Sequence, residues 1–218
     1  MFYFFFSPAI FVLLRAVVRF FGRVRSSGEE NVPHSGPVIY CPNHLSDSDP
    51  PTMFVTLPRR AWFVAKDDLR AVPILGWILA HGHVIFIKRD SADRRALRQC
   101  EQVLRRGEPL LLFPEGRCAV GETLLHMHSG PAHLALRTGA PIVPVGIQNT
   151  NRMLPYKSVW YRFADHPVTV RFGTPIRPQE YSSLSKSLAT AALTADLAEA
   201  LSELACRPID SSRRHSTQ

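Results

Sequence analysis

The sequence predicts an α/β fold in which a mixed, mostly parallel sheet is flanked by helices. Apolar runs of strand length alternate with amphipathic stretches of helix length through most of the chain, which is typical of α/β folds. At 218 residues and 45% hydrophobic content, the chain can bury one good core, so one main domain is expected. The sequence contains no internal repeat and no long linker.

The first segment, residues 1–27, is predicted to be a helix that anchors the protein at a membrane interface. Residues 1–14 are almost wholly apolar, but this run is shorter than the roughly 20 residues that a spanning helix needs. Arg15, Arg19 and Arg23 recur at every fourth position and therefore share one helical face. A basic stripe opposite apolar side chains is typical of a helix lying among lipid headgroups.

The same pattern leaves a second interpretation of this segment open and disfavours a third. A tilted span over residues 2–21 is left open by the pattern, because arginines near the end of a span can snorkel to the interface. A signal peptide is disfavoured, because no basic residue precedes the apolar run and no small-x-small cleavage site follows it.

The main domain is expected over residues 28–207, with a polar, flexible tail over residues 208–218. Its strands are predicted from apolar runs that are bounded by turn residues. These runs are residues 36–41, 61–65, 84–87, 110–112, 140–147 and 167–172.

Helices are predicted between these strands from caps and apolar spacing. One helix is capped by Ser91 and ends at Gly107, another opens at Ser129 and is closed by Gly139, and a last amphipathic helix covers residues 184–204. The buried stripe of the first of these is expected to consist of Ala96, Leu97, Cys100, Val103 and Leu104.

The most informative motif is a histidine, His44, followed five residues later by Asp49. Histidine has the ordinary pKa closest to neutral pH, and a nearby carboxylate can fix its tautomer and stabilise the imidazolium. His44 follows the strand predicted at 36–41, and Asp49 enters a helix that begins within residues 47–51, where cap residues precede two prolines. The pair is a candidate general base with its orienting carboxylate.

An ordinary structural role is the alternative for these residues. Asp47 and Ser48 are natural helix N-caps, and Asp49 can complement a helix dipole. A lone histidine in a loop is also more often structural than catalytic. The motif therefore gains its functional meaning from the blocks that follow it.

Three further blocks follow the His44–Asp49 block in the chain. They are residues 84–89 (VIFIKR), 113–116 (FPEG) and 142–145 (IVPV). This ordered set resembles the glycerolipid acyltransferase family, in particular the 1-acylglycerol-3-phosphate acyltransferases with their HxxxxD motif. The resemblance extends over residues 36–178 and implies the fold of that family.

The resemblance implies transfer of a fatty acyl group from acyl-CoA or acyl-carrier protein to the free hydroxyl of 1-acylglycerol 3-phosphate (lysophosphatidic acid), which makes phosphatidic acid in phospholipid biosynthesis. His44 would remove the hydroxyl proton, Asp49 would hold the imidazole, and backbone N–H groups near the helix start after His44 would bind the oxyanion. The sequence lacks a Gly-x-Ser-x-Gly elbow and a recognisable Cys–His protease context, and the acceptor hydroxyl can itself be the nucleophile. Neither a covalent acyl-enzyme nor a cofactor is required.

The resemblance also implies a set of substrate-binding residues. Arg89 would bind the acceptor phosphate, because a guanidinium can hold phosphate in a bidentate manner, and Lys66 and Arg117 are secondary candidates. Glu115 and Gly116 belong to the same set, with Glu115 orienting an arginine or the turn, or accepting a hydrogen bond from the glycerol hydroxyl. For each basic residue, a solvated surface charge is the alternative.

One departure from the family pattern lies next to these residues. The family usually continues Glu-Gly with Thr-Arg, whereas this chain continues with Arg117 and Cys118. The arginine therefore comes one position early.

Composition favours an anionic membrane surface as a partner. The formal net charge is +8 and the isoelectric point is near 9.8. Nucleic acid is disfavoured, because the sequence has no zinc-finger spacing, helix-turn-helix signature or aromatic–basic RNP pattern. We expect a membrane-associated protein on the cytoplasmic face, with four reduced cysteines. No metal site is expected, because the His-x-His pairs at 81–83 and 126–128 lack further ligands at recognised spacing.

Other functions are left open by the sequence. The acceptor alternatives are another lysolipid, including an amino-acid-based one, and glycerol 3-phosphate. A hydrolase or phosphodiesterase using His44 and Asp49 with water is a second class. A catalytically silent lipid-binding protein that keeps the fold and the anchor is a third.

Overall fold

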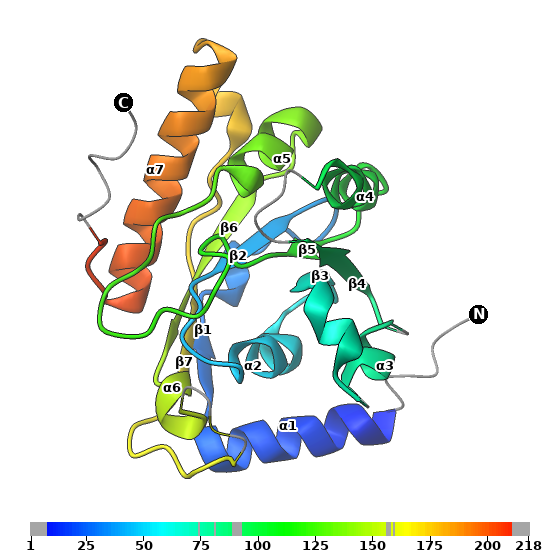
Figure 1. The fold of residues 1–218 in the computed structure, drawn as a ribbon. Coiled ribbons are helices and arrows are strands. Elements are labelled where there is room, and N and C mark those ends of the chain that lie inside the picture. Colours follow the sequence, from blue (N-terminus) through cyan, green and yellow to red (C-terminus); the bar gives the residue numbers. More distant parts are fainter. Residues whose placement is uncertain are drawn as a thin grey trace.

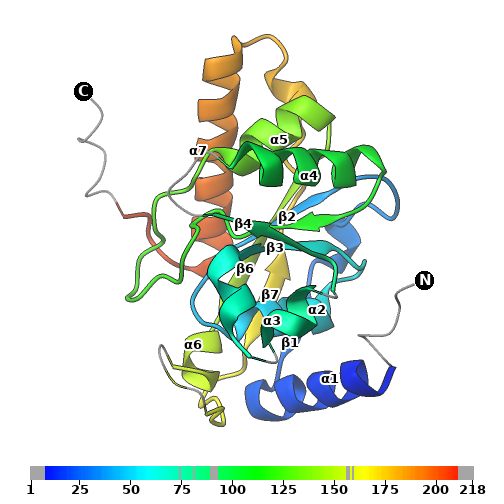
Figure 2. The same cartoon turned by 45° about the vertical axis from the view of Figure 1, so that its right-hand side comes forward.

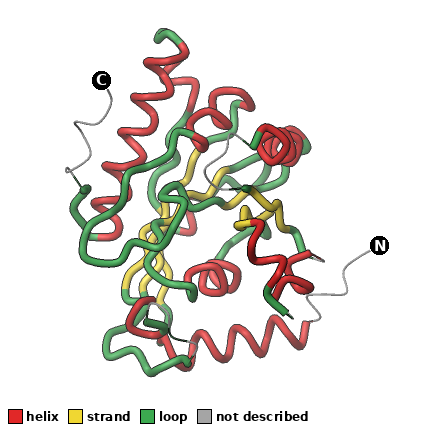
Figure 3. Tube along the Cα trace, in the orientation of Figure 1, coloured by secondary structure: helices red, strands yellow, loops and turns green. Residues whose placement is uncertain are grey.

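The computed structural model describes residues 8–73, 75–80, 82–88, 93–155, 158 and 160–210. These residues form a seven-stranded sheet with helices against both of its faces, which confirms the predicted α/β class (Figure 1). Figure 3 shows the strands gathered in the middle of the molecule and the helices outside them.

The strands coincide with the predicted apolar runs, except for one additional strand at the edge. They are β1 (Arg25–Ser27), β2 (Ile39–Pro42), β3 (Trp62–Lys66), β4 (Val84–Ile87), β5 (Leu110–Leu111), β6 (Ile142–Gln148) and β7 (Thr169–Phe172). Their order in the sheet is β1-β7-β6-β2-β5-β3-β4. Strands β2 to β6 are parallel, β7 is antiparallel to β6, and β1 is parallel to β7. The sheet is therefore mixed and mostly parallel, as predicted.

Strand β1 was not predicted, and its composition explains why. Its three residues are polar or charged and exposed, so they carry no apolar pattern. They pair with β7 at the edge of the sheet. In the sequence they come directly after the first helix, within the segment 1–27 that was predicted to be a helix.

Five helices lie between strands, one precedes the first strand and one follows the last strand in the described part of the chain. They are α1 (Pro8–Gly22), α2 (Asp49–Thr56), α3 (Leu75–Ala80), α4 (Arg94–Arg105), α5 (Gly130–Thr138), α6 (Thr150–Met153) and α7 (Lys186–Ala205). Single 3₁₀ turns occupy Glu29–Asn31, Asp67–Ala71 and Pro178–Tyr181. The short helices α3 and α6 are absent from the sequence prediction, since six and four residues are too few to show a helical period.

Helix α4 begins at a different cap from the one predicted. The N-cap is Asp93, whose carboxylate accepts hydrogen bonds from the N–H groups of Arg95 and Ala96 at 3.1 and 3.0 Å. The predicted cap, Ser91, lies outside the described residues. Of the predicted stripe, Leu97 is half-buried. The buried members are Ala96, Cys100, Val103 and Leu104.

Alternate residues of the strands face two separate cores, as the two-residue period of a strand requires. Ile39 of β2 packs with α4, α5 and α7, whereas Tyr40 packs on the opposite face with Met53 of α2. A third apolar cluster, which includes Val18 and Val55, lies between α1 and α2. The layers are therefore α4, α5 and α7, then the sheet, then α2, then α1 (Figures 1 and 2).

Helix α1 is bound to the domain along one side. Val18 is fully buried, and the carbonyl groups of Phe21 and Gly22 accept hydrogen bonds from the N–H groups of Ala164 and Val168 at 2.9 and 2.8 Å. Among the described helices, none combines the length and the apolarity that crossing a bilayer demands.

The predicted basic stripe of α1 differs from the structure at Arg23. This residue follows the helix with a φ angle of +47°, and its guanidinium donates to the carbonyl groups of Ala164 and Asp165. Arg23 therefore fixes the helix end to the domain. Arg19 remains exposed and Arg15 is half-buried.

The carboxyl ends of the five parallel strands lie along one edge of the sheet. His44 follows β2, Lys66 ends β3, Lys88 follows β4 and the 113–116 block follows β5. In open α/β sheets, ligands bind outside the carboxyl ends of the strands. The fold thus places histidine, lysine and glutamate residues along the edge of the sheet where a ligand-binding site is expected.

Candidate active site

The His44 and Asp49 side chains meet at the start of α2. His44 Nδ1 lies 2.8 Å from Asp49 Oδ2, and the histidine side chain is 11% exposed while the aspartate is fully buried. In the neutral imidazole, a hydrogen bond from Nδ1–H to the carboxylate leaves the lone pair on Nε2, on the other side of the ring from Asp49. This is the arrangement of a general base with an orienting carboxylate.

Asp49 also closes the loop that carries His44. Its Oδ2 accepts hydrogen bonds from the N–H groups of Leu45 and Ser46, at 2.5 and 2.9 Å. Oδ1 is buried and has no partner among the described residues. Because one carboxylate oxygen receives three donors, the loop and the imidazole are oriented together.

The backbone before His44 is fixed to the sheet by a side chain. Asn43 donates to the carbonyl of Ile147 at 3.0 Å and accepts from its N–H at 2.6 Å, which extends the pairing of β2 with β6 beyond the strand end. Phe113 stacks on the imidazole of His44 with ring centroids 4.1 Å apart. His44 is therefore held both by its backbone and by its ring.

Glu115 connects two segments of the site through backbone groups. Its Oε1 accepts from the N–H of His44 at 2.7 Å, and its Oε2 accepts from the N–H of Leu125 at 2.8 Å. Burial raises the pKa of the Glu115 carboxyl group, and these hydrogen bonds partly offset that effect. With both oxygens used in this way, Glu115 orients the turn and the histidine backbone.

Gly116 allows the turn after Glu115 to form. Its φ angle is +69°, and a Cβ atom there would lie 3.0 Å from His128 Nε2. A residue with a side chain would be strained in this left-handed conformation and crowded by the histidine. The 113–116 block therefore requires glycine at this position.

Cys118 contacts the imidazole of His44. Its Sγ lies 3.4 Å from Nε2 and 3.5 Å from Nδ1 of His44. It is also 3.8 Å from Oδ1 of Asp47. Cys118 was not predicted to be a site residue, although it stands where the chain departs from the family pattern.

The surroundings of His44 favour its protonated form. Burial lowers the pKa of His44, but hydrogen bonds and negative charge from Asp49 and Cys118 raise it to about 10. With a pKa of about 10, most of His44 is protonated at neutral pH, so the fraction that can act as a base rises with pH.

The predicted basic residues are distributed differently along the edge of the sheet. Lys66 ends β3 and forms an ion pair with Asp68. Arg117 is exposed, and its guanidinium has no hydrogen bond or ion pair to any described residue. Arg89 lies outside the described residues. Histidine, cysteine and acidic side chains form no cluster of three with metal-binding geometry within the part of the chain that the structure describes.

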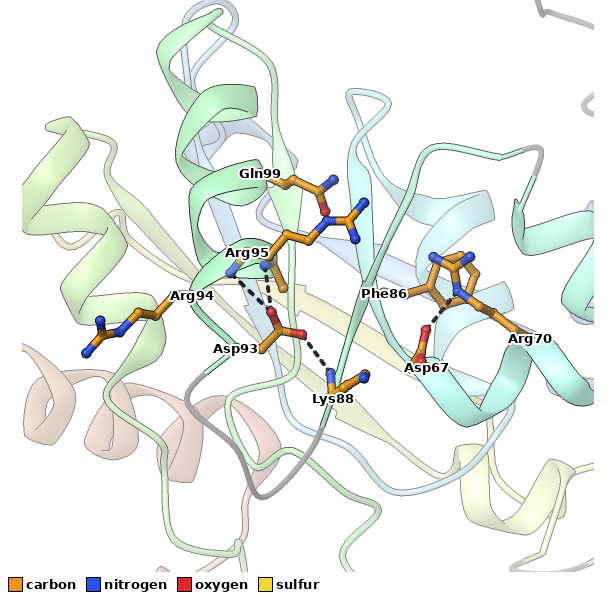
Figure 4. A pocket seen from close by; sticks show the side chains of 9 residues that line it. Asp67, Arg70, Phe86, Lys88, Asp93, Arg94, Arg95 and Gln99 are labelled. Atoms are coloured by element: carbon orange, nitrogen blue, oxygen red, sulfur yellow. Dashed lines mark hydrogen bonds and ion pairs between the residues drawn. The ribbon is translucent and has the colours of Figure 1, made fainter.

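A basic pocket lies where β4 ends and α4 begins, with a volume of about 550 Å³ (Figure 4). Its charged lining consists of Asp67, Arg70, Lys88, Asp93, Arg94 and Arg95. Arg70 pairs with Asp67 at 2.8 Å and lies over the ring of Phe86, 3.9 Å from its centroid. The pocket was not predicted, because it joins three segments that are separate in the sequence.

Comparison with known proteins identifies one family. The family model described as "Acyltransferase" matches residues 23–148. A lyso-ornithine lipid O-acyltransferase of Pseudomonas aeruginosa is 37% identical over 125 residues, which cover 57% of this chain and 46% of that protein. A 1-acyl-sn-glycerol-3-phosphate acyltransferase of Borreliella burgdorferi is 30% identical over 148 residues, covering 65% and 59%. The chain thus matches about half the length of these relatives.

A solved structure matches over a larger share. The crystal structure of PlsC, a 1-acyl-sn-glycerophosphate acyltransferase from Thermotoga maritima, has a TM-score of 0.69 and 26% sequence identity. The match covers 92% of this chain and 81% of the other. The fold therefore extends beyond the region that the family model matches.

Proposed function

Because the chain belongs to the acyltransferase family, we propose that it transfers a fatty acyl group from a thioester donor to the hydroxyl of a lysophospholipid. The observation that carries this proposal is the orientation of His44, whose Nδ1 is fixed by buried Asp49 while Nε2 is left without a bond to a carboxylate and has a hydrogen-bond contact only with Cys118 among the described residues. Lysophosphatidic acid is the acceptor we favour, and acyl-CoA or acyl-carrier protein is the donor. No resident cofactor takes part.

In the proposed reaction, Nε2 of His44 removes the proton of the acceptor hydroxyl as its oxygen attacks the thioester carbon. Asp49 stabilises the resulting imidazolium. The tetrahedral intermediate then collapses, the carbon–sulfur bond breaks, and the imidazolium returns the proton to the leaving thiolate. The products are an ester and a free thiol, and His44 is regenerated.

The oxyanion of the intermediate needs N–H donors. The N–H groups of Leu45 and Ser46, near the helix start, are bound to Asp49 instead. In the described part of the chain, the N–H groups of Arg117 and Cys118 have no hydrogen-bond partner. Because the Cys118 side chain contacts His44, we assign the oxyanion to these two groups.

The acceptor is tested with a panel of lysolipids. Purified protein would receive acyl-CoA with lysophosphatidic acid, lyso-ornithine lipid or glycerol 3-phosphate, and products would be identified by mass spectrometry. Phosphatidic acid as the main product supports the proposal. Lyso-ornithine lipid is the competing acceptor, because the Pseudomonas relative is named a lyso-ornithine lipid O-acyltransferase. Acylation of that lipid alone would reassign the acceptor.

Arg89→Ala is expected to raise the KM for lysophosphatidic acid, because a charge-assisted contact with the acceptor phosphate would be lost. Such contacts contribute about 1.5–3 kcal/mol, so the KM should rise about tenfold or more while the KM for the donor changes little. Initial rates with each substrate varied in turn measure both constants. An equal rise in both would show that Arg89 has a structural role.

We further propose that the protein meets the membrane through an aromatic patch that extends the surface of α1. The patch consists of Phe20, Trp160 and Phe163, which are 64%, 78% and 63% exposed. Phe20 and Phe163 are in contact, with ring centroids 4.9 Å apart. Exposed aromatic side chains beside Arg19 suit the interface of an anionic bilayer. The segments that carry these residues, the end of α1 and the loop after α6, lie at the base of the molecule in Figure 1.

Trp160→Ala combined with Phe163→Ala is expected to weaken binding to anionic vesicles at least about tenfold, since each buried aromatic side chain contributes about 1.5–3 kcal/mol. Vesicle co-sedimentation measures the change. Leu188→Ala is the matched control, because Leu188 is 60% exposed near the start of α7, at the opposite end of the molecule (Figure 1). Unchanged vesicle binding by the double variant would refute the patch as a membrane contact.

A further inference from the structure

We propose that the basic pocket beside α4 binds the phosphate of the donor's 4′-phosphopantetheine arm, a group that acyl-CoA and acyl-carrier protein share. This inference rests on the proposed acyl transfer. It assigns a ligand to Arg94 and Arg95, which the reaction at His44 does not otherwise use.

The strand register places the pocket relative to His44. Tyr40 of β2, Leu111 of β5, Phe63 of β3 and Val84 of β4 form one row across the sheet. His44 is four residues beyond the first of these and Lys88 is four residues beyond the last, so both lie at about the same height along the strands. Three strand spacings of about 4.8 Å separate β2 from β4, which puts the two positions about 14 Å apart.

The separation of about 14 Å matches the length of the donor's phosphopantetheine arm and is larger than the distance between the hydroxyl and the phosphate of the acceptor. About thirteen bonds join the thioester sulfur to the phosphorus of phosphopantetheine, and at about 3.5 Å for every three backbone-type bonds the extended arm spans about 15 Å. By the same measure, the four or so bonds between the hydroxyl oxygen and the phosphorus of lysophosphatidic acid span about 5 Å. For Arg89, which directly follows Lys88, to bind the acceptor phosphate as proposed above, its side chain must reach from this position toward His44, whereas the pocket itself lies at the distance that the donor arm spans.

The charges of the pocket leave cationic side chains available for an anion. Asp67 is paired with Arg70, and the Asp93 carboxylate accepts from three N–H groups, those of Lys88, Arg95 and Ala96. The guanidinium groups of Arg94 and Arg95 make no hydrogen bond or ion pair with any described residue. Figure 4 shows Arg95 reaching across the pocket towards the side of Arg70 and Phe86.

The far end of α4 shows the contrast. Arg105 pairs with Glu101 at 2.7 Å, and Arg106 pairs with Glu108 at the same distance. Arg94, Arg95 and Arg98, in the first half of α4, have no described partner, and of these Arg94 and Arg95 line the pocket. Their guanidinium groups are therefore available to bind a phosphate.

The test measures binding of non-reacting donors. Two S-alkyl thioethers, one of 4′-phosphopantetheine and one of pantetheine, differ only in the phosphate and cannot transfer an acyl group. Arg94→Ala combined with Arg95→Ala is expected to weaken the phosphorylated analogue about tenfold, as measured by isothermal titration calorimetry, and to leave the unphosphorylated one unchanged. Arg98→Ala is the matched control, because Arg98 is exposed on α4, has no described partner and does not line the pocket.

Binding measurements with two further analogues identify the molecule that supplies the phosphate. The same loss for the S-alkyl thioethers of CoA and of phosphopantetheinylated carrier protein supports the shared arm as the ligand. A loss confined to the carrier protein would overturn the inference in favour of a protein contact, and equal losses for both pantetheine analogues would overturn it as well. Because these readouts need no turnover, a failure to acylate any lysolipid would refute the proposed function without changing them.

Discussion

His44→Ala is expected to lower kcat for acyl transfer by about 10²–10⁴-fold, because the acceptor hydroxyl loses the base that takes its proton. The fold should persist, since among the described residues the imidazole bonds only to Asp49 and Cys118 and stacks on Phe113. Initial rates at saturating substrate, together with circular dichroism, measure both effects. A variant that folds normally and keeps more than about a tenth of the activity would remove His44 from the mechanism.

Asp49→Asn is expected to reduce kcat by a similar factor, because the amide no longer orients and stabilises the imidazolium. The hydrogen bonds and charge of Asp49 raise the pKa of His44, so their loss should lower that pKa from about 10. Since the base is the deprotonated form, activity of the native protein should rise with pH through the neutral range. In the variant, the residual activity should reach its plateau at a lower pH.

Asp47→Asn provides the matched control for this substitution. Asp47 is exposed and lies two residues before Asp49, and its Oδ1 is 3.8 Å from Cys118 Sγ. Its loss should leave kcat within a few-fold of the native value. If Asp47→Asn proved the more damaging change, the orienting carboxylate would be Asp47.

Much of the fold could be predicted because its strands are short apolar runs between clear breaks. The runs at 84–87 and 140–147 coincide closely with β4 and β6, and a cap motif marks α5 between Ser129 and Gly139. What could not be predicted lacks a local signal. β1 is polar, and its pairing depends on β7, more than 140 residues away.

The N-terminal helix illustrates a second limit of the sequence. Its apolar spacing predicts an amphipathic helix but does not separate a face that packs on α2 from a face that meets lipid. Val18 is buried in the domain, whereas Phe20, two residues later, is 64% exposed. Arg23 shares the spacing of Arg15 and Arg19, yet it binds two backbone carbonyl groups.

The candidate site was partly accessible from sequence. His44 and Asp49 are close in the chain, so their contact could be proposed from spacing alone. The roles of Glu115 and Cys118 depend on β5 lying next to β2, which brings residues about 70 positions apart to the same histidine. Arg89, the predicted phosphate ligand, lies outside the described part of the chain.

The central claim is that His44 activates the acceptor hydroxyl for direct attack on the thioester. The most direct measurement is thiol release from acyl-CoA, followed with a thiol reagent in the presence and absence of lysophosphatidic acid. We expect release only with the acceptor, in a one-to-one ratio with ester formed, and loss of that release in His44→Ala. Thiol release by the native protein without an acceptor would indicate a hydrolase, and no release under any condition would indicate a lipid-binding protein; either result would contradict this claim.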